Sequence, residues 1–187
     1  AVWIAQSGPL IFDLFSIKRL IEYFGDRMST QLKTDSPTAL RRKREIAEAA
    51  RAELLEKGFE GLRMRAVADR CGINVATLDY HAGGKEGLIG LVAESLVEDF
   101  MEIRQRLDPN ATTGLDELTQ EIIMFRRVRL AKPDIHPVMA TLSPRAHTDP
   151  AIARHILPIK AYWHENFTEM IHKGQTDATL HDHHHPD

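Results

Sequence analysis

The sequence has little cysteine and no long apolar run. Cys71 is its single cysteine, so no disulfide can form within the chain, which is typical of proteins in a reducing compartment. A run of about 18 uninterrupted apolar residues, the length that would span a bilayer, does not occur. Residues 1–24 are apolar in places but lack the basic start and the cleavage pattern of a secretory signal. We therefore expect a cytoplasmic protein that has no membrane partner.

Arrangements of residues that carry chemistry are also missing. The sequence contains no nucleophile paired with a base, no phosphate-binding loop and no zinc-ligand spacing. We therefore expect no enzyme, no catalytic residue and no cofactor.

Two groups of side chains could in principle bind a transition metal. They are the terminal group His181, Asp182, His183, His184 and His185, and the helical group Glu165, Glu169 and His172. Clustered terminal histidines more often form a solvated tail, and charges on one helix face more often form a surface stripe. We therefore expect no metal site.

Charge is distributed unevenly along the chain. Residues 1–40 hold four basic and four acidic side chains, residues 41–85 hold ten and seven, and residues 86–187 hold ten and sixteen. The net charge of −3 argues against a protein that coats nucleic acid. A modestly basic segment followed by an acidic one nevertheless fits a DNA-binding module joined to a different domain.

Residues 1–35 differ in pattern from the rest of the chain and are interpreted as an extension. Met28, followed by serine and threonine, fits a natural start, which would make residues 1–27 an upstream addition. The alternative is an additional amphipathic helix over residues 12–24.

A first helix is predicted over residues 36–57. The Ser36 side chain can accept from a free backbone N–H group, and Pro37 at the first helical position lacks only a donor that would go unused. Ile46, Ala50 and Leu54 recur every four residues on the apolar face. Gly58 is expected to end the helix.

Two shorter helices come next, over residues 64–71 and 75–81. Gly72 separates them, and Asn74 is the expected cap of the second. With that cap, Ile73 and Leu78 occupy the positions of a hydrophobic staple, which fixes the angle between the helices. Two short helices joined by a tight turn form a helix-turn-helix.

Longer helices are predicted beyond Gly84, and nothing in the sequence alternates with the period of a β-strand. They cover residues 85–107, 115–132, 137–147 and 149–173. The fold is therefore predicted to be all-α, with a three-helix head over residues 36–84 and a helical domain over residues 85–187.

Four short stretches between residues 41 and 100 stand in a specific order and spacing. They are Gly58-Phe59-Glu60-Gly61, Val67-Ala68-Asp69-Arg70-Cys71-Gly72-Ile73, Ala76-Thr77-Leu78-Asp79-Tyr80-His81 and Lys85-Glu86-Gly87-Leu88. In this order they resemble the TetR/AcrR family of transcriptional regulators. The resemblance implies that the chain binds a double-stranded DNA operator, as a repressor that a small molecule releases.

The resemblance, together with the way a recognition helix enters the major groove, selects candidate DNA contacts. These are Arg63, Arg65, Asn74, Val75, Ala76, Thr77, Tyr80, His81 and Lys85. Arg65 is the candidate for a guanine contact, and Lys85 is the candidate for a phosphate contact at a helix start.

The sequence departs from the family at several of these positions. Asp79 stands where the family usually has a phosphate-contacting tyrosine, Ala82 replaces a phenylalanine, and Arg63 replaces a threonine cap. Val75 occupies a position that is often basic or polar. The alternative is therefore a helical ligand- or partner-binding protein with a degenerate head.

The second half is expected to bind the effector and to form a homodimer. Candidate lining residues for a ligand pocket are Met124, Phe125, Met139, Tyr162, Trp163 and Phe167; ordinary helix packing is the competing explanation. Because the chain reaches Asp187 soon after the last predicted helix, the dimer-forming bundle of the family is expected to be shortened. An incomplete regulator that does not dimerise is a further alternative.

Overall fold

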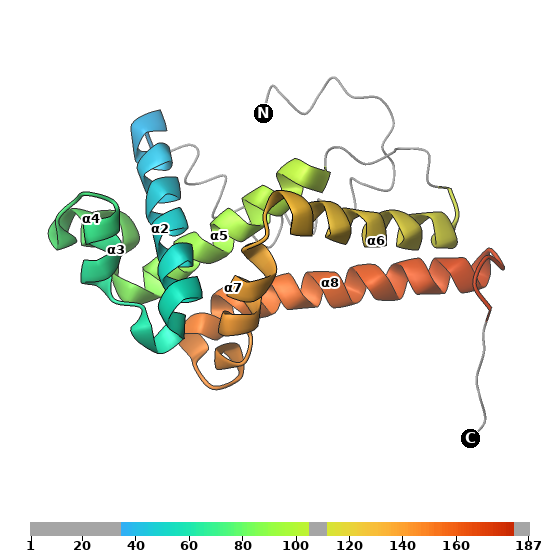
Figure 1. Cartoon of the computed structure of the whole chain (residues 1–187). Coiled ribbons are helices and arrows are strands. Elements are labelled where there is room, and N and C mark those ends of the chain that lie inside the picture. The colour runs from blue at the N-terminus through green and yellow to red at the C-terminus, as the bar shows by residue number, and fades with distance from the viewer. Residues whose placement is uncertain (1–34, 105–111, 182–187) are drawn as a thin grey trace.

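The computed structural model describes residues 35–104 and 112–181. Within these ranges the chain forms seven α-helices and a short 3₁₀ helix, with no strand (Figure 1). They are α2 (Pro37–Gly61), α3 (Met64–Arg70), α4 (Val75–Ala82), α5 (Gly84–Arg104), α6 (Gly114–Ala131), α7 (Ile135–Leu142), η1 (Arg145–His147) and α8 (Pro150–Thr176). The predicted all-α class is confirmed. Residues 1–27, for which the sequence left two interpretations, lie outside the described residues. Residues 182–187, which include most of the terminal histidines, also lie outside them.

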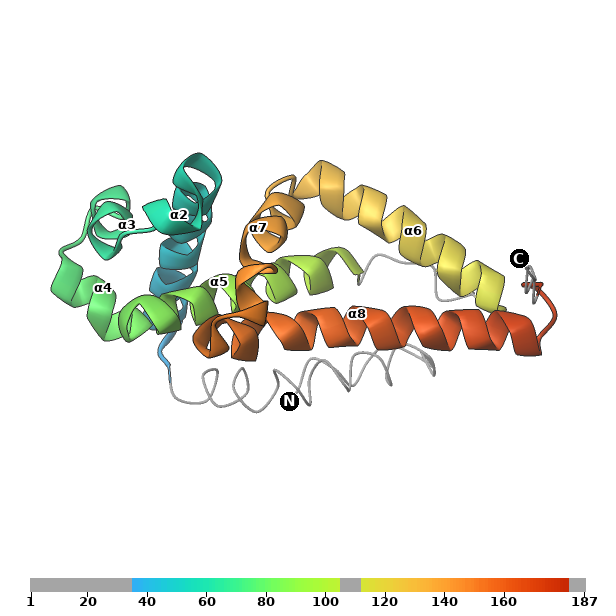
Figure 2. The same ribbon diagram turned by 90° about the horizontal axis from the view of Figure 1, so that it is seen from below.

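The helices form an elongated molecule with a head at one end. Figure 1 shows α2, α3 and α4 gathered there, while α6 and α8 lie side by side and antiparallel in the rest of the body. Helix α5 leads from the head into the body and packs against α2, α6 and α8. In Figure 2 α7 lies between the head and α6. One hydrophobic core runs through the whole, from Ile46 in the head to Tyr162 in α8, so the division at residue 84 stays a prediction.

The first helix of the head follows the local sequence rules. Ser36 accepts a hydrogen bond from the backbone N–H of Ala39 at 3.2 Å, and Pro37 opens α2. The predicted apolar residues Ile46, Ala50 and Leu54 are buried. Gly58 leaves the helical conformation (φ 66°, ψ −177°), after which the chain completes one more turn to Gly61. The regular helix therefore ends at Gly58 as predicted, and one further turn, still within the bounds of α2, follows across a kink.

Helix α3 is held on α2 by a buried carboxylate. Glu53 is 2% exposed, and it accepts from Lys57 Nζ at 2.8 Å and from Arg70 Nη2 at 2.8 Å. These bonds from Lys57 and Arg70 lower the pKa of Glu53 against the opposing effect of burial. The lowered pKa keeps the carboxylate ionised and paired between the two helices.

One predicted helix in the body is wrong. Residues 137–147 do not form a single helix: α7 ends at Leu142, and a separate 3₁₀ turn begins at Arg145. Pro144 lies between them, where it supplies no N–H donor and restricts the residue before it. Pro137 is tolerated in the first turn of α7, because the N–H groups there have no partner within the helix, and the helix therefore starts at Ile135.

Helix α5 passes close to α8 at Gly90. A Cβ atom at this position would lie 2.9 Å from Cε1 of His155 in α8, and His155 is itself buried. Only glycine fits this contact without displacement of the ring. Gly90 therefore sets how closely α5 and α8 can pack.

Candidate DNA-binding surface and the buried network behind it

Helix α4 is presented by a rigid turn after α3. Gly72 has a positive φ of 65°, and the N–H of Ile73 returns to the carbonyl of Ala68 at 3.0 Å. Asn74 caps α4, because its side-chain oxygen accepts from the N–H of Thr77 at 2.7 Å. At the other end Gly83, with φ 69° in the left-handed region, ends the helix. The predicted cap and the predicted helix-turn-helix are confirmed.

The two faces of α4 differ sharply in burial. Leu78 is fully buried in the core of the head, whereas Tyr80 is 84% exposed. Val75 and Ala76 are exposed at the start of the helix, and Thr77 is half-buried. The outward face of α4 thus has small side chains at its N-terminal end and a phenol near its C-terminal end, where His81 packs edge-on to the Tyr80 ring at 5.2 Å.

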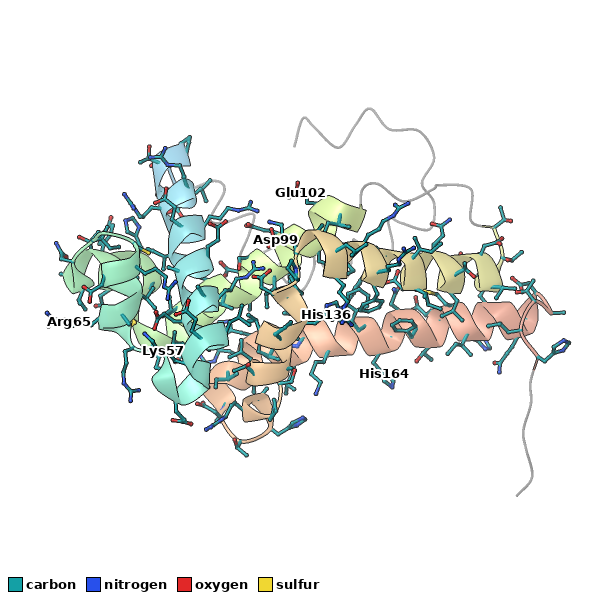
Figure 3. The ribbon with its side chains drawn as sticks, viewed as in Figure 1. Lys57, Arg65, Asp99, Glu102, His136 and His164 are labelled. Atoms are coloured by element: carbon teal, nitrogen blue, oxygen red, sulfur yellow. The ribbon has the colours of Figure 1, made fainter. Side chains whose placement is uncertain are left out.

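Two exposed arginines lie at the start of α3, Arg63 just before it and Arg65 in its first turn. Arg63 is exposed and precedes α3, and its side chain makes no capping hydrogen bond. Arg65 is exposed in the first turn of α3, and Figure 3 places it at the outer edge of the head. Both cationic groups are therefore accessible to an anionic partner beside α4.

Lys85 lies in the first turn of α5, on the exposed surface of the head. Its ammonium is 4.5 Å from the centroid of the Phe59 ring, and the guanidinium of Arg145 lies 5.1 Å from the same centroid. Cation–π contacts at exposed sites are weak, about 0.5–1 kcal/mol, so the ammonium can exchange this contact for a phosphate. Phe59, which packs against the core, thus also positions two cations.

Asp79 departs from the family pattern in a way that the structure makes visible. It is exposed next to Tyr80, and within residues 35–104 and 112–181 no ion pair neutralises it. Ala82 is half-buried and packs against the core. The unusual feature of the outward face of α4 is therefore the negative charge of Asp79.

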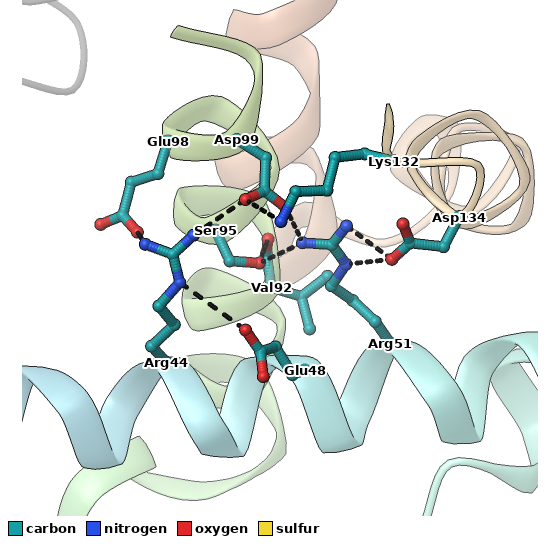
Figure 4. A network of polar contacts seen from close by, with 9 residues as sticks. All are labelled: Arg44, Glu48, Arg51, Val92, Ser95, Glu98, Asp99, Lys132 and Asp134. Atoms are coloured by element: carbon teal, nitrogen blue, oxygen red, sulfur yellow. Dashed lines mark hydrogen bonds and ion pairs between the residues drawn. The ribbon is translucent and has the colours of Figure 1, made fainter. Parts of the chain in front are cut away.

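A buried network of polar side chains, away from the outward face of α4, connects the head to the body (Figure 4). Arg51 of α2 is 4% exposed and donates to Asp99 of α5 at 2.6 Å. The same guanidinium donates through Nε to Asp134, just before α7, at 2.7 Å. Ser95 lies 3.4 Å from it. A single side chain of the head therefore joins α5 to the start of α7.

Asp99 is the other centre of this network. It accepts from Arg51, from Arg44 at 2.9 Å and from Lys132 at 3.0 Å. Burial would raise the pKa of Asp99, but the hydrogen bonds from Arg51 and Lys132 outweigh it and hold the pKa below its ordinary value. The carboxylate stays ionised, and the head, α5 and the end of α6 meet at its two oxygen atoms.

None of the residues in this network was expected from the sequence to have a role. One signal was available: Arg51 falls on the same helical face as Ala47, Ala50 and Leu54, all of which are buried. A charged residue on an apolar face requires a buried partner. The partners could not be named, because Asp99 and Asp134 are 48 and 83 positions away.

The candidate ligand residues gather between α6 and α8. The rings of Phe125 and Trp163 are 4.8 Å apart, Phe167 lies 5.9 Å from Phe125, and Tyr162 lies 5.4 Å from Trp163. Phe100 of α5, which the sequence did not select, packs edge-on to Trp163 at 4.4 Å. His136 of α7, which is labelled in Figure 3, lies with its ring 5.8 Å from the ring of Phe125.

The two candidate methionines are placed differently. Met124 is fully buried on α6, whereas Met139 on α7 is half-buried against the core. The structure thus brings the candidate residues to one region. A ligand role for them stays a prediction.

Other sequence predictions concern metals and membranes. Among the described residues, no group of three His, Cys, Asp or Glu side chains is arranged to hold a metal ion. Within the same ranges, none of the helices combines the length and the apolar character needed to cross a bilayer.

Comparison with known proteins agrees with this geometry. Residues 46–92 match the bacterial regulatory proteins of the tetR family, and this match covers the helix-turn-helix and the start of α5. No curated protein matches the chain.

Two similar solved structures extend the likeness beyond the head. A HlyIIR mutant protein that carries a linker with two thrombin sites is 19% identical, with a TM-score of 0.59 over 78% of this chain and 76% of that one. A transcriptional regulator from Rhodococcus sp. Rha1 is 20% identical, with a TM-score of 0.51 over 72% of this chain and 66% of that one. At these identities the likeness establishes the fold. The helix-turn-helix head is thus similar to the DNA-binding domain of the tetR family of bacterial regulatory proteins, and the chain is a DNA-binding transcriptional regulator.

Proposed function

We propose that this regulator represses transcription by occupying a palindromic operator, and that a small molecule bound in its body releases it. The observation that carries the proposal is the outward face of α4: Tyr80 is 84% exposed while Leu78 of the same helix is fully buried. A helix whose inner side is buried in the head and whose outer side is exposed to solvent is suited to enter the major groove.

Each candidate contact then has a role that follows from its position. Val75 and Ala76 are small, so the start of α4 can approach base edges and thymine methyl groups. Asn74, Thr77, Tyr80 and His81 supply polar groups along the same helix. Arg65 reaches a guanine, while Arg63 and Lys85 bind phosphates on either side.

The release step is proposed to use the aromatic cluster. Trp163 of that cluster contacts Phe100 of α5, and α5 carries the head. A ligand seated against Phe125, Trp163 and Phe167 would displace α5 by way of Phe100. Because Arg51 ties α2 to Asp99 of the same helix, the head would move with α5 and its alignment with the operator would change.

Two copies are proposed to bind together. A short recognition helix reads few base pairs, and helix-turn-helix dimers place their half-sites about 34–36 Å or a multiple of that apart. We assign the head to residues 36–84 and the effector-binding and dimerising part to residues 85–187. The proposed setting is the cytoplasm, where DNA is accessible, and no enzymatic activity is proposed.

The proposal is tested by selecting duplexes from a random pool at low salt and titrating the best one with single variants. Tyr80→Ala and Lys85→Ala are each expected to weaken binding, because each removes an exposed group at the groove. Lys160→Ala on α8 removes a similar charge away from the head and should leave the affinity unchanged. Unchanged affinity for both head variants would remove the proposed contacts.

A second candidate function is favoured by Asp79. Its exposed carboxylate would be repelled by the DNA backbone, which fits a ligand- or partner-binding protein whose head has lost its DNA affinity. In that case the parent chain binds no duplex in the selection, and Asp79→Tyr creates measurable affinity. Strong binding by the parent chain would eliminate this second function.

A further inference from the structure

The turn between α7 and α8 reaches the DNA-binding head. Arg145, the first residue of η1, holds its guanidinium over the ring of Phe59, 5.1 Å from the centroid. The same guanidinium pairs with the carboxylate of Glu60. Phe59 and Glu60 belong to the turn that follows the kink of α2. A cation of the body is therefore positioned on the surface of the head.

The ring of Phe59 also carries the cation that is proposed to bind a phosphate. Nζ of Lys85 lies 4.5 Å from the ring centroid. The ammonium and the guanidinium of Arg145 are therefore separated by no more than the sum of their two distances, about 9.6 Å. Each strand of DNA carries one phosphate per about 3.4 Å of helix axis. Both cations can thus reach phosphates of one strand that are a few nucleotides apart at most.

Two exposed acids of this region are each paired with an arginine of the body. Glu60, which follows Phe59, pairs with Arg145. Glu86, which follows Lys85, pairs with Arg154 of α8 at 2.6 Å. Without these partners both carboxylates would repel an approaching phosphate. The body therefore supplies positive charge at the part of the head where Lys85 is proposed to meet DNA.

The contacts that hold Arg145 leave it available to an anion. Its side chain is 44% exposed and that of Glu60 is 73% exposed, and ion pairs this exposed contribute little to stability. A guanidinium can stay stacked on an aromatic ring while its edge donates two parallel hydrogen bonds to a phosphate. Arg145 can therefore exchange Glu60 for a phosphate without leaving Phe59.

We propose that Arg145 is a DNA contact contributed by the body, and that it binds a backbone phosphate near the one bound by Lys85. The inference rests on the proposed function, in which Lys85 meets the DNA backbone. Arg145 lies outside the helix-turn-helix, and a phosphate contact carries no direct sequence information. Its contribution to affinity is therefore the same for every duplex sequence.

The contact makes DNA affinity depend on how the head sits on the body. Arg145 is carried by η1, whereas Lys85 is carried by α5. Both phosphates are within reach only while Arg145 stays on the ring of Phe59. A ligand that moves the head relative to η1 would separate the two cations, and one phosphate contact would be lost even where α4 kept its alignment.

The test measures the affinity of the full chain for the selected operator and for an unrelated duplex at several salt concentrations. Arg145→Met should weaken binding to both by the same factor, about tenfold at low salt, and should reduce the slope of log affinity against log salt by about 0.9 per bound copy. Arg126→Met, which removes an exposed arginine of α6, should change neither. An Arg145→Met variant that binds like the parent, that loses affinity for the operator alone, or that loses no more than Arg126→Met overturns the proposal.

A second set of variants separates a phosphate contact from the neutralisation of Glu60. In a Glu60→Gln background the carboxylate is gone, so an arginine that only cancels its charge has no further role. Arg145→Met should still lower the affinity and the slope in this background, by about as much as in the parent. Arg145→Lys keeps the charge and should keep the slope. Loss of the Arg145→Met effect in the Glu60→Gln background would overturn the phosphate contact.

Lys85→Ala distinguishes failure of this inference from failure of the proposed function. Weaker binding by Lys85→Ala together with parental binding by Arg145→Met contradicts this inference alone. Weaker binding by Arg145→Met together with parental binding by Lys85→Ala upholds the contact of the body and contradicts the role proposed for Lys85. A parent that binds no duplex even at low salt contradicts both.

Discussion

The guanidinium of Arg51 lies 2.6 Å from the carboxylate of Asp99, and the two side chains are only 4% and 3% exposed. Arg51 belongs to the DNA-binding head and Asp99 to the helix that leads into the body. A buried pair is tolerated when its remaining polar groups are satisfied, which Asp134, Arg44 and Lys132 do here. The pair fixes how the head sits on α5.

Loss of Arg51 should destabilise the protein strongly. Arg51→Met keeps most of the buried volume but removes the partner of two carboxylates, and breaking a buried pair costs about 3–5 kcal/mol. The free energy of unfolding in urea measures the effect. Arg41→Met, at a residue whose side chain is 73% exposed, should change it by less than about 0.5 kcal/mol. Equal unfolding midpoints for both variants would show that the network does not stabilise the fold.

The contribution of Asp99 should depend on pH. Because its pKa is held below the ordinary value of about 3.9, its ionised form stabilises the folded chain above that pH. This stability is lost as the pH falls through the lowered pKa. The difference in unfolding free energy between the parent and Asp99→Asn should therefore be constant near neutral pH and shrink in acid. A difference that grows in acid would contradict the sign of the shift.

The cap of α4 can be separated from its DNA contacts. Asn74→Ala removes the acceptor for the Thr77 N–H and should lower the unfolding free energy by about 1 kcal/mol, whereas Asn74→Ser keeps a cap and should cost little. Tyr80→Ala alters an exposed ring and should leave stability near that of the parent. Thermal unfolding without DNA compares the three. Equal loss in the alanine and serine variants at residue 74 would show that the cap bond is not what matters.

Removing the charge of Asp79 should strengthen DNA binding. Asp79→Asn relieves repulsion from phosphates, and Asp79→Lys adds a phosphate contact. The lysine variant should steepen the slope of log affinity against log salt by about 0.9. Titration of one duplex at several salt concentrations gives this slope. Glu169→Gln, on α8, serves as the control for a general change in net charge. An unchanged slope for Asp79→Lys would show that residue 79 does not face the backbone of DNA.

Local rules predicted much of the head. Ser36, Asn74 and Gly83 act through bonds or backbone angles within a few residues of themselves, so the sequence around each contains the whole signal. The error at residues 137–147 is of the same local kind, because Pro144 already marked the break.

The buried network around Arg51 and Asp99 and the aromatic cluster between α6 and α8 could not be predicted from the local sequence. Arg51 finds Asp134 only when α2, α5 and α7 pack together, and nothing near residue 51 specifies residue 134. Phe100 was missed for the same reason, since its role depends on which face of α5 meets Trp163. Long-range packing decides these partners.

The contact at Gly90 gives α5 a point about which it can tilt. With His155 seated against the glycine, the helix can tilt about that point more easily than it can move closer to α8. Phe100 is ten residues or about 15 Å along the helix from this point. Asp99, to which Arg51 and Arg44 hold the head, lies directly before Phe100, so a push on Phe100 would turn α5 and the head together.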